Sequence, residues 1–476
     1  MTANVKEFVY LGSTMTANVK EFVYLGSTMT ANVKEFVYLG STMTANVKEF
    51  VYLGSTMTAN ANLDDEVDFR ASAAFGRLQG HVWQRRGLSI SIQVKVYETN
   101  MSKSLPLLYT TGTYYEVGYS IGSTFAERIN RFWSESENLI RCELPFYETP
   151  RGQEYFNTAL KVCEMNFPQY IQEIKGMADG AKMPFDRLFK LNISKEVRNI
   201  SKNFPFAYKE RSGCTDIYLN TPTVKILAHN EDCDFKIDTY AYMVSVRIVD
   251  DQSGTELENF TSFCYPGELP GTAIAFNRHG LVFTGNALYA EHVIETATPR
   301  QFINRSLMKA HSIDEVIELI KNPGFGVAIG FSLNVVDIEN PTCMWSVEVG
   351  PHANVSLVHV LTIAEERDPS KSGHYYHVNN YRHLEIEEIP GFMSSIARSK
   401  RIEELPPPSN KHEVKCLLGD QDNKVYPMYR TKCPPDILAT ALTAIVDVNK
   451  NRIDFYSENP SREKAVPLFH LNVLDL

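Results

Sequence analysis

The chain has 476 residues, of which 43% are hydrophobic and 22% charged, a balance typical of a globular protein. Its formal net charge of -10 and its pI near 5.7 argue against nucleic-acid and anionic-membrane partners, which bind basic faces. No apolar run reaches the roughly 18 residues of a membrane helix, and the N-terminus carries no secretory signal pattern. We therefore expect a cytoplasmic protein that binds neither nucleic acid nor membrane.

A tandem repeat occupies the N-terminal part of the chain. The unit MTANVKEFVYLGST occurs four times from Met1 to Thr56, and a fifth copy begins at Met57. A period of this length is shorter than the roughly 20 to 50 residues of solenoid repeats. The stretches FVYLGST, ASAAFGRL and RRGLS resemble the C-terminal part of retrotransposon reverse transcriptases, without a polymerase core. We expect residues 1–100 to be an extension outside the main fold; the alternative is an oligomerising segment.

Coherent patterning begins after a second methionine start at Met101. The segment PQYIQEIKGMADGA predicts a helix, because its apolar residues recur at helical spacing. Its apolar face consists of Tyr170, Ile171, Ile174, Met177 and Ala178. Farther along, CTDIYLN and TVKILAHNED predict two strands that form a hairpin across residues 220–222.

The C-terminal half predicts a further helix and many strands. The helix runs from Ser312 to Lys321, begins with a capping box between Ser312 and Glu315, and stops at residues 322–324. The strands are GFSLNVVDI, CMWSVEV, NVSLVHVLTI and a pair around residues 449–451. Helices followed by many antiparallel-type strands predict an α+β layered sandwich.

Cys214 is the candidate nucleophile. It follows Gly213 where a loop passes into a strand, and glycine permits the strained backbone that an internal N-to-S acyl shift requires. Once the Gly213–Cys214 bond is cut, the new α-amine has a reference pKa of about 7.7–8.0, below the thiol's pKa of about 8.5. This amine can accept the thiol proton without a histidine. The alternative is a papain-like enzyme that uses His279 or His377 as its base.

Two patterns resemble metal-binding sequences. One is the pair His374 and His377, and the other is the acidic cluster Glu231, Asp232 and Asp234. Neither has a complete ligand set at zinc or EF-hand spacing. The eight cysteines show no paired CxxC spacing, which favours free thiols. We therefore expect no metal and no cofactor.

From about Leu107 to the C-terminus, the chain resembles the isopenicillin-N acyltransferase-like family of N-terminal nucleophile hydrolases. The matching stretches include GTYYEVGYSIGSTF, SGCTDIYL, HNED, FTGNALYAE, TPRQFINRSL, YHVNNY and LLGDQDNKVYPMYR. The resemblance implies a four-layer αββα sandwich. It also implies self-cleavage into a chain of residues 101–213 and a chain of residues 214–476, which stay together as a heterodimer.

The same resemblance implies a role for four residues. Cys214 matches the nucleophile, and Asp232 matches an acid that accepts hydrogen bonds from the new α-amine. Asn286 matches an amide that stabilises the oxyanion. Arg430 matches an arginine whose fixed charge favours the thiolate. The alternatives are structural: a turn carboxylate, a turn asparagine and a surface arginine.

Glu196 and Asn379 match further family positions, and the resemblance implies that they bind substrate. The implied substrate is a small N-acyl amine, namely an N-β-alanyl or similar biogenic amine such as β-alanyl-dopamine, cleaved to β-alanine and the free amine. Two other functions remain open. One is an acyl-CoA-dependent N-acyltransferase with the same catalytic groups, and the other is a catalytically silent or chimeric gene product.

Overall fold

The computed structural model describes residues 105–201, 213–233, 235–368, 370–390, 393–432 and 438–475, together with seven strands before Leu105. Met101 and Asp234 lie outside the described residues. The contacts within the chain divide it into two units, Met1–Arg85 and Arg86–Leu474. Each unit is described separately below.

The first unit contains a sheet built from the tandem repeats. Its strands are β1 (Thr2–Leu11), β2 (Thr14–Leu25), β3 (Thr28–Leu39), β4 (Thr42–Ala45), β5 (Val51–Tyr52) and β6 (Ser55–Thr56). The strands β1, β2 and β3 are parallel, and each residue pairs with the equivalent residue of the next copy, as Thr2 does with Thr16. The register of this sheet is therefore set by the length of the repeat.

The second unit contains a layer of helices between the strands β8 (Leu105–Gly112) and β9 (Gly213–Asn220). The helices are α2 (Tyr114–Thr124), α3 (Ala126–Glu135), the π-helical η1 (Leu139–Glu143), α4 (Leu144–Tyr147), α5 (Pro150–Asn166), α6 (Pro168–Ala181), α7 (Phe185–Asn192) and α8 (Ser194–Ile200). The predicted helix at PQYIQEIKGMADGA is α6, and all five residues of its predicted apolar face are buried. This prediction is confirmed.

Glycines let α2 and α6 approach each other closely. A Cβ atom at Gly118 or Gly122 of α2 would collide with the α6 carbonyl oxygens of Glu173 and Met177. On α6, Gly176 and Gly180 meet the backbone of α2 in the same way. Each helix therefore carries a pair of glycines four residues apart on the face that contacts its partner.

A nine-stranded sheet forms one half of the core of this unit, in the order β19-β17-β16-β14-β13-β12-β11-β8-β7. Only β8 and β11 pair in parallel, and the other neighbours are antiparallel. The strands are β7 (Ile90–Val94), β8 (Leu105–Gly112), β11 (Tyr242–Val249), β12 (Glu256–Cys264), β13 (Ala275–Asn277), β14 (Leu281–Ala287), β16 (Phe331–Asp337), β17 (Cys343–Gly350) and β19 (Leu357–Ala364).

A six-stranded sheet forms the other half, in the order β20-β9-β10-β21-β22-β23. The predicted hairpin and the predicted pair of strands around residues 449–451 both lie in this sheet, and both are confirmed. The strands are β9 (Gly213–Asn220), β10 (Lys225–Cys233), β20 (His374–His377), β21 (Ala439–Asp447), β22 (Arg452–Tyr456) and β23 (Phe469–Asn472).

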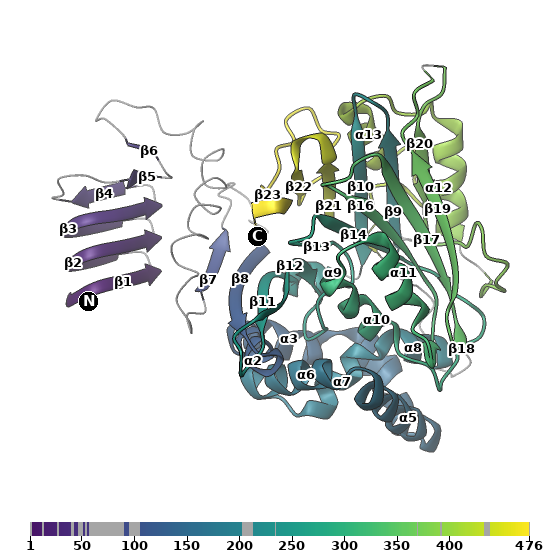
Figure 1. Ribbon diagram of the computed structural model, residues 1–476, viewed down its shortest axis with the longest axis horizontal. Helices are drawn as coiled ribbons and strands as arrows, with labels where there is room; N and C mark the ends of the chain where they lie inside the picture. Colours follow the sequence, from purple (N-terminus) through teal and green to yellow (C-terminus); the bar gives the residue numbers. More distant parts are fainter. Residues whose placement is uncertain are drawn as a thin grey trace. The chain divides into compact units, whose positions relative to one another are not determined.

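The two sheets face each other between two layers of helices (Figure 1). Side chains of α2 and α6 pack in one core cluster with the nine-stranded sheet. Side chains of α12 (Met393–Glu404) and α13 (Lys411–Leu418) pack in another with the six-stranded sheet. Between the sheets, the Tyr218 hydroxyl donates to Asn334 Oδ1 at 2.5 Å. The predicted αββα sandwich is confirmed.

Smaller elements complete this unit. They are α9 (Phe235–Tyr240), α10 (Arg300–Ser306), α11 (Ile313–Lys321), the two-stranded sheet of β15 (Phe325–Val327) and β18 (His352–Asn354), and the 3₁₀ turns η3 (Leu307–Lys309), η4 (Val448–Lys450) and η5 (Val473–Asp475). The predicted capping box of α11 forms only in part. The Ser312 side chain accepts from the Glu315 amide, but the Glu315 carboxylate binds the amide of His311 at 2.9 Å, one residue earlier than predicted.

None of the helices in the described part of the chain is both long and apolar enough to cross a bilayer.

Candidate active site

Four polar side chains meet where β9 and β10 lie side by side. In this antiparallel pair, Cys214 lies opposite Glu231 and Asp216 lies opposite His229. Alternate residues of a strand point to the same face, so all four side chains project from one face of the sheet. Asp216 accepts hydrogen bonds from Thr284 and Asn286 of β14, which shows that this face is the one turned toward the nine-stranded sheet.

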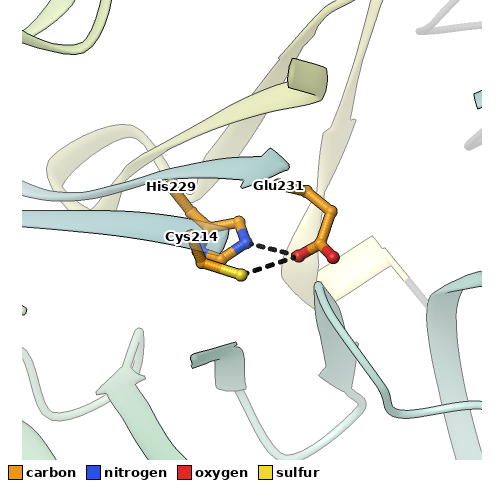
Figure 2. A group of neighbouring side chains, drawn as sticks. All are labelled: Cys214, His229 and Glu231. Atoms are coloured by element: carbon orange, nitrogen blue, oxygen red, sulfur yellow. Dashed lines mark hydrogen bonds and ion pairs between the residues drawn. The ribbon is translucent and has the colours of Figure 1, made fainter. Parts of the chain in front are cut away.

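Glu231 contacts both Cys214 and His229 directly (Figure 2). Glu231 Oε2 lies 3.6 Å from Cys214 Sγ and 2.9 Å from His229 Nε2. The other ring nitrogen of His229, Nδ1, lies 2.9 Å from Asp216 Oδ2. Glu231 Oε1 accepts a hydrogen bond from the Tyr265 hydroxyl. All of these side chains are buried, so their polar atoms depend on one another rather than on water.

Burial and neighbouring charges set the protonation states of this cluster. Burial, reinforced by the charge of Glu231, raises the pKa of the Cys214 thiol to about 12. Burial alone would lower the pKa of His229, but the charge of Asp216 and hydrogen bonds to Asp216, Cys214 and Glu231 raise it well above the usual value. In the uncut chain, burial thus favours the neutral thiol, and the neighbouring carboxylates favour the charged form of the imidazole.

On the other side of the peptide bond before Cys214, Gly213 lies opposite Asp232. Asp232 Oδ1 accepts from the Thr440 hydroxyl at 2.6 Å, and Oδ2 lies 3.9 Å from Arg430 Nη1. Burial raises the pKa of Asp232 to about 6, against the lowering effect of Arg430 and Arg398. A Cβ atom at Gly213 would collide with Arg430 Nη1, so a larger residue here would displace the Arg430 guanidinium from its place beside Asp232.

The structural alternatives to these roles do not fit the observed positions. Asp232 lies inside β10 and Asn286 inside β14, so neither occupies a turn. Arg430 is buried, with 4% of its surface exposed, so it is not a surface arginine.

Asn379 and Arg398 hold the backbone of Cys214. The Cys214 amide donates to Asn379 Oδ1 at 2.9 Å, and Arg398 Nη1 donates to the Cys214 carbonyl at 2.5 Å and to Thr215 Oγ1 at 2.8 Å. Arg398 Nη2 also donates to Asn379 Oδ1 at 2.7 Å. Asn379 thus holds the backbone of the candidate nucleophile, and its predicted role in substrate binding stays a prediction. Arg398, in α12, was not predicted.

Asn286 and Glu196 form hydrogen bonds with residues other than Cys214. Asn286 Nδ2 donates to Asp216 at 2.7 Å, so Asn286 connects to Cys214 through Asp216, His229 and Glu231. Glu196 accepts from the Arg300 amide at 2.8 Å, while its Oε2 has no hydrogen-bond partner among the described residues. Burial raises the pKa of Glu196 to about 7.

The histidine beside Cys214 is His229, which the sequence interpretation missed. His377 Nε2 is 3.0 Å from Glu348 and its Nδ1 faces the Val378 carbonyl, whereas the His279 ring packs on His311. Both papain-like candidates are therefore engaged elsewhere. The usable signal was the two-residue spacing of His229 and Glu231 on a predicted hairpin strand, which matches the spacing of Cys214 and Asp216 on its partner.

Cys214, His229 and Glu231 are also the residues of the described chain best placed to hold a metal ion. One ligand atom from each lies within 4.8 Å of the others. Thiolate, imidazole and carboxylate are the groups that bind zinc, and the hydrogen bond from His229 Nδ1 to Asp216 is the usual outer support of such a ligand. The same atoms already bind one another in the structure.

Comparison with known proteins places the chain in a family. Residues 219–462 match the acyl-coenzyme A:6-aminopenicillanic acid acyl-transferase family. The β-alanyl-dopamine/carcinine hydrolase of Drosophila melanogaster is 33% identical over 367 residues, which cover 75% of this chain and 94% of the relative. This chain belongs to the acyl-coenzyme A:6-aminopenicillanic acid acyl-transferase family. The resemblance inferred from the motifs is confirmed, and the chain is an enzyme of the amide-hydrolase class.

Two further relatives are more distant. The 40 kDa form of the acyl-coenzyme A:6-aminopenicillanic-acid-acyltransferase of Emericella nidulans is 26% identical over 227 residues, which cover 46% of this chain and 57% of the relative. A mutant conjugated bile acid hydrolase from Clostridium perfringens is a similar solved structure, with a TM-score of 0.31 and 13% identity over 53% of this chain and 96% of that one.

Proposed function

We propose that this chain is a self-processing cysteine amidohydrolase whose nucleophile is Cys214, freed as an N-terminus by cleavage after Gly213. Family membership supports the coarser class of enzyme. The observation that carries the finer proposal is the position of the Gly213–Cys214 bond at the start of β9. There the Cys214 amide is held by Asn379, and the residue opposite Gly213 is the buried carboxyl of Asp232.

In the mature enzyme, the new α-amine occupies the place of the Cys214 amide. It donates to Asn379 Oδ1 and to the Asp232 carboxylate, while Arg430 beside Asp232 favours the charged form of that carboxylate. The neutral amine takes the proton from Sγ, since its reference pKa is close to that of the thiol. Cleavage thereby gives the buried thiol a base on its own residue, which the uncut chain lacks.

The thiolate attacks the carbonyl carbon of the substrate amide and forms a tetrahedral oxyanion. We assign its stabilisation to Asn286, whose amide nitrogen has two hydrogens and gives one to Asp216. The α-amine, now charged, protonates the departing amine. Water then hydrolyses the Cys214 thioester, which releases the acid and restores the thiol.

The proposed substrate is an N-β-alanyl biogenic amine, cleaved to β-alanine and the free amine. This choice is supported by the Drosophila relative, which is a β-alanyl-dopamine/carcinine hydrolase. An acyl-CoA-dependent N-acyltransferase is the second candidate, supported by the family and by the Emericella relative. The two differ in the acceptor of the acyl group, which is water in the first and an amine in the second.

Denaturing electrophoresis and mass spectrometry of the purified full chain test the processing step. We expect two fragments, of residues 1–213 and 214–476, from the wild type, and a single chain from Cys214→Ala. Cys343→Ala, at a partly buried cysteine of β17, is the matched control and should be cut normally. Active wild-type enzyme with residues 213 and 214 still joined would refute the proposal.

Product analysis separates hydrolase from transferase. Pure processed protein is incubated with β-alanyl-dopamine, with and without free acceptor amine, and separately with an acyl-CoA and an amine. Release of β-alanine in the absence of any acceptor supports the hydrolase. Acyl transfer from acyl-CoA without hydrolysis of β-alanyl-dopamine supports the transferase.

A further inference from the structure

Self-cleavage poses a chemical problem that the mature mechanism does not solve. Before the cut, the nitrogen of Cys214 belongs to a peptide bond, so the α-amine that later deprotonates the thiol does not yet exist. The thiol is also buried, which raises its pKa and disfavours the thiolate. A different group must therefore take the thiol proton in the first reaction of the chain.

The carboxylate of Glu231 is the acceptor that the described residues place beside the sulfur. Its Oε2 lies 3.6 Å from Cys214 Sγ, within hydrogen-bonding distance for sulfur. The same oxygen is held by His229 Nε2, and the second oxygen is held by the Tyr265 hydroxyl. Figure 2 shows the sulfur and the imidazole converging on this one oxygen.

The other two candidates for this proton are less suitable. Asp232 points to the far face of the sheet, where its oxygens face Thr440 and Arg430. Each ring nitrogen of His229 already lies 2.9 Å from a carboxylate oxygen, Nδ1 from that of Asp216 and Nε2 from that of Glu231, so the ring is held between two acceptors.

We propose that Glu231 is the general base of self-cleavage at Gly213–Cys214, and that His229 and Asp216 are positioning residues that hold it. The inference rests on the proposed function, since it assigns the base of its first step. Asp216 is itself fixed by Thr284 at 2.5 Å and Asn286 at 2.7 Å. A continuous series of contacts therefore connects β14 to Cys214 Sγ through Asp216, His229 and Glu231.

The reaction balances as follows. The Sγ–H bond breaks, its proton passes to Glu231 Oε2, and sulfur bonds to the Gly213 carbonyl carbon while the carbonyl electron pair moves to oxygen. Collapse of this intermediate re-forms the carbonyl and breaks the Gly213–Cys214 C–N bond, and the nitrogen takes up the proton that Glu231 holds. Water then attacks the thioester, so that Gly213 gains a carboxyl group and Sγ regains its proton.

The test measures the rate of the first cut directly. Full-length chains are synthesised by cell-free translation with a radioactive pulse, and the conversion of precursor to fragments is followed on denaturing gels. Glu231→Gln, which keeps the shape of the side chain but cannot act as a base, should slow the cut at least 100-fold, within the usual range for general base catalysis. Glu231→Asp restores a carboxylate and should recover part of the rate.

Controls separate the chemistry from folding and from the proposed function. Glu348→Gln removes another buried carboxylate, one that binds His377 on β17, and should cleave within about twofold of wild type. Thermal unfolding shows whether each variant folds. His229→Gln keeps Glu231 but removes the ring that positions it, and should therefore also slow the cut. Thiol labelling of the denatured precursor should show that Cys214 is unmodified.

Each outcome decides one question. A wild-type chain that is never cleaved would refute the proposed function itself. A wild type that cleaves, together with a folded Glu231→Gln that cleaves at the same rate, overturns only the role of Glu231. If Glu231→Gln does not fold, Glu231→Asp tests the role of Glu231 instead. The aspartate side chain is one methylene shorter, so its carboxylate lies farther from the sulfur. An unchanged rate in Glu231→Asp then refutes the proposal, and a rate at least tenfold lower supports it.

Discussion

Glu196 shows how burial alone can make a side chain sensitive to pH. The carboxyl is fully buried in α8, one of its oxygens accepts from the Arg300 amide, and the other has no hydrogen-bond partner among the described residues. Desolvation therefore raises the pKa of Glu196 to about 7, whereas an unfolded glutamate titrates near 4.3. The folded protein thus binds this proton more tightly than the unfolded chain.

This difference predicts the pH dependence of stability. As the pH rises from about 4.3 to about 7, the unfolded chain loses the Glu196 proton first, so the free energy of unfolding falls, by roughly 4 kcal/mol in total. Above pH 7 the contribution is constant. Glu196→Gln removes the titration, so its unfolding free energy should fall less than that of the wild type between pH 5 and 8. Parallel curves from chemical denaturation at the two ends of this range would contradict the prediction.

Arg398 is predicted to be the most important side chain of α12 for stability. It donates to the Cys214 carbonyl, Thr215 Oγ1 and Asn379 Oδ1 while only 1% exposed. Arg398→Met leaves three buried acceptors short of a donor and should lower the free energy of unfolding by about 3 kcal/mol or more. Lys400→Met, on the same helix with its side chain 77% exposed, should change it by less than about 0.5 kcal/mol. Equal effects would refute the assignment.

Among individual residues, the sequence singled out Cys214 because it follows Gly213 where a loop passes into a strand and because it matches the nucleophile of the family. Its catalytic role stays a prediction. Arg398 was not singled out, because it reaches the site from a helix 184 residues farther along the chain, and nothing in its polar surroundings distinguishes it. Glu231 was considered only as a metal ligand, because its partnership with Cys214 depends on the register of two strands.

Secondary-structure elements were easier to predict, because each depends on a pattern of neighbouring residues. The helix α6, the hairpin of β9 and β10 and the pair β21 and β22 all formed as expected. Which strands share a sheet was not predictable in the same way. The parallel pairing of β8 with β11, for example, joins residues that are more than a hundred positions apart.

The contact between α2 and α6 makes a sharp prediction at this scale. Gly122→Ala adds a methyl group where the Met177 carbonyl leaves no room, and backbone atoms cannot rotate away as a side chain can. The helices must separate, so we expect a loss of about 2–4 kcal/mol in unfolding free energy. Ser123→Ala, at the next and exposed position of α2, should have little effect. A Gly122→Ala protein that melts like the wild type would show that the helices are not in close contact.

The division of the chain into two units leads to a prediction about the whole molecule. Because the contacts of Met1–Arg85 lie mainly within that unit, a protein that starts at Arg86 should keep a melting temperature within about 2 °C of the full chain. A protein that starts at Met101 also loses β7, which pairs with β8, and should melt lower. Differential scanning fluorimetry of the three proteins checks both statements. A large loss on removal of residues 1–85 would contradict the first.

The resemblance of residues 1–100 to a reverse-transcriptase fragment stays a prediction, as do the boundaries at residues 100 and 213. Neither follows from the fold. The sheet of the first unit follows from the repeats, because identical copies pair in register. This pairing does not bear on catalysis. The residues of the candidate active site all lie in the second unit.

The parallel pairing of β8 with β11 has a consequence for the cleaved enzyme. β8 comes before residue 213 and β11 comes after it, yet β8 is hydrogen-bonded along its length to β11 inside a continuous sheet. A cut after Gly213 would therefore end covalent continuity without freeing either piece, because separation would require the sheet itself to be torn open. The two polypeptides should elute together from a gel-filtration column in native buffer and part only in denaturant.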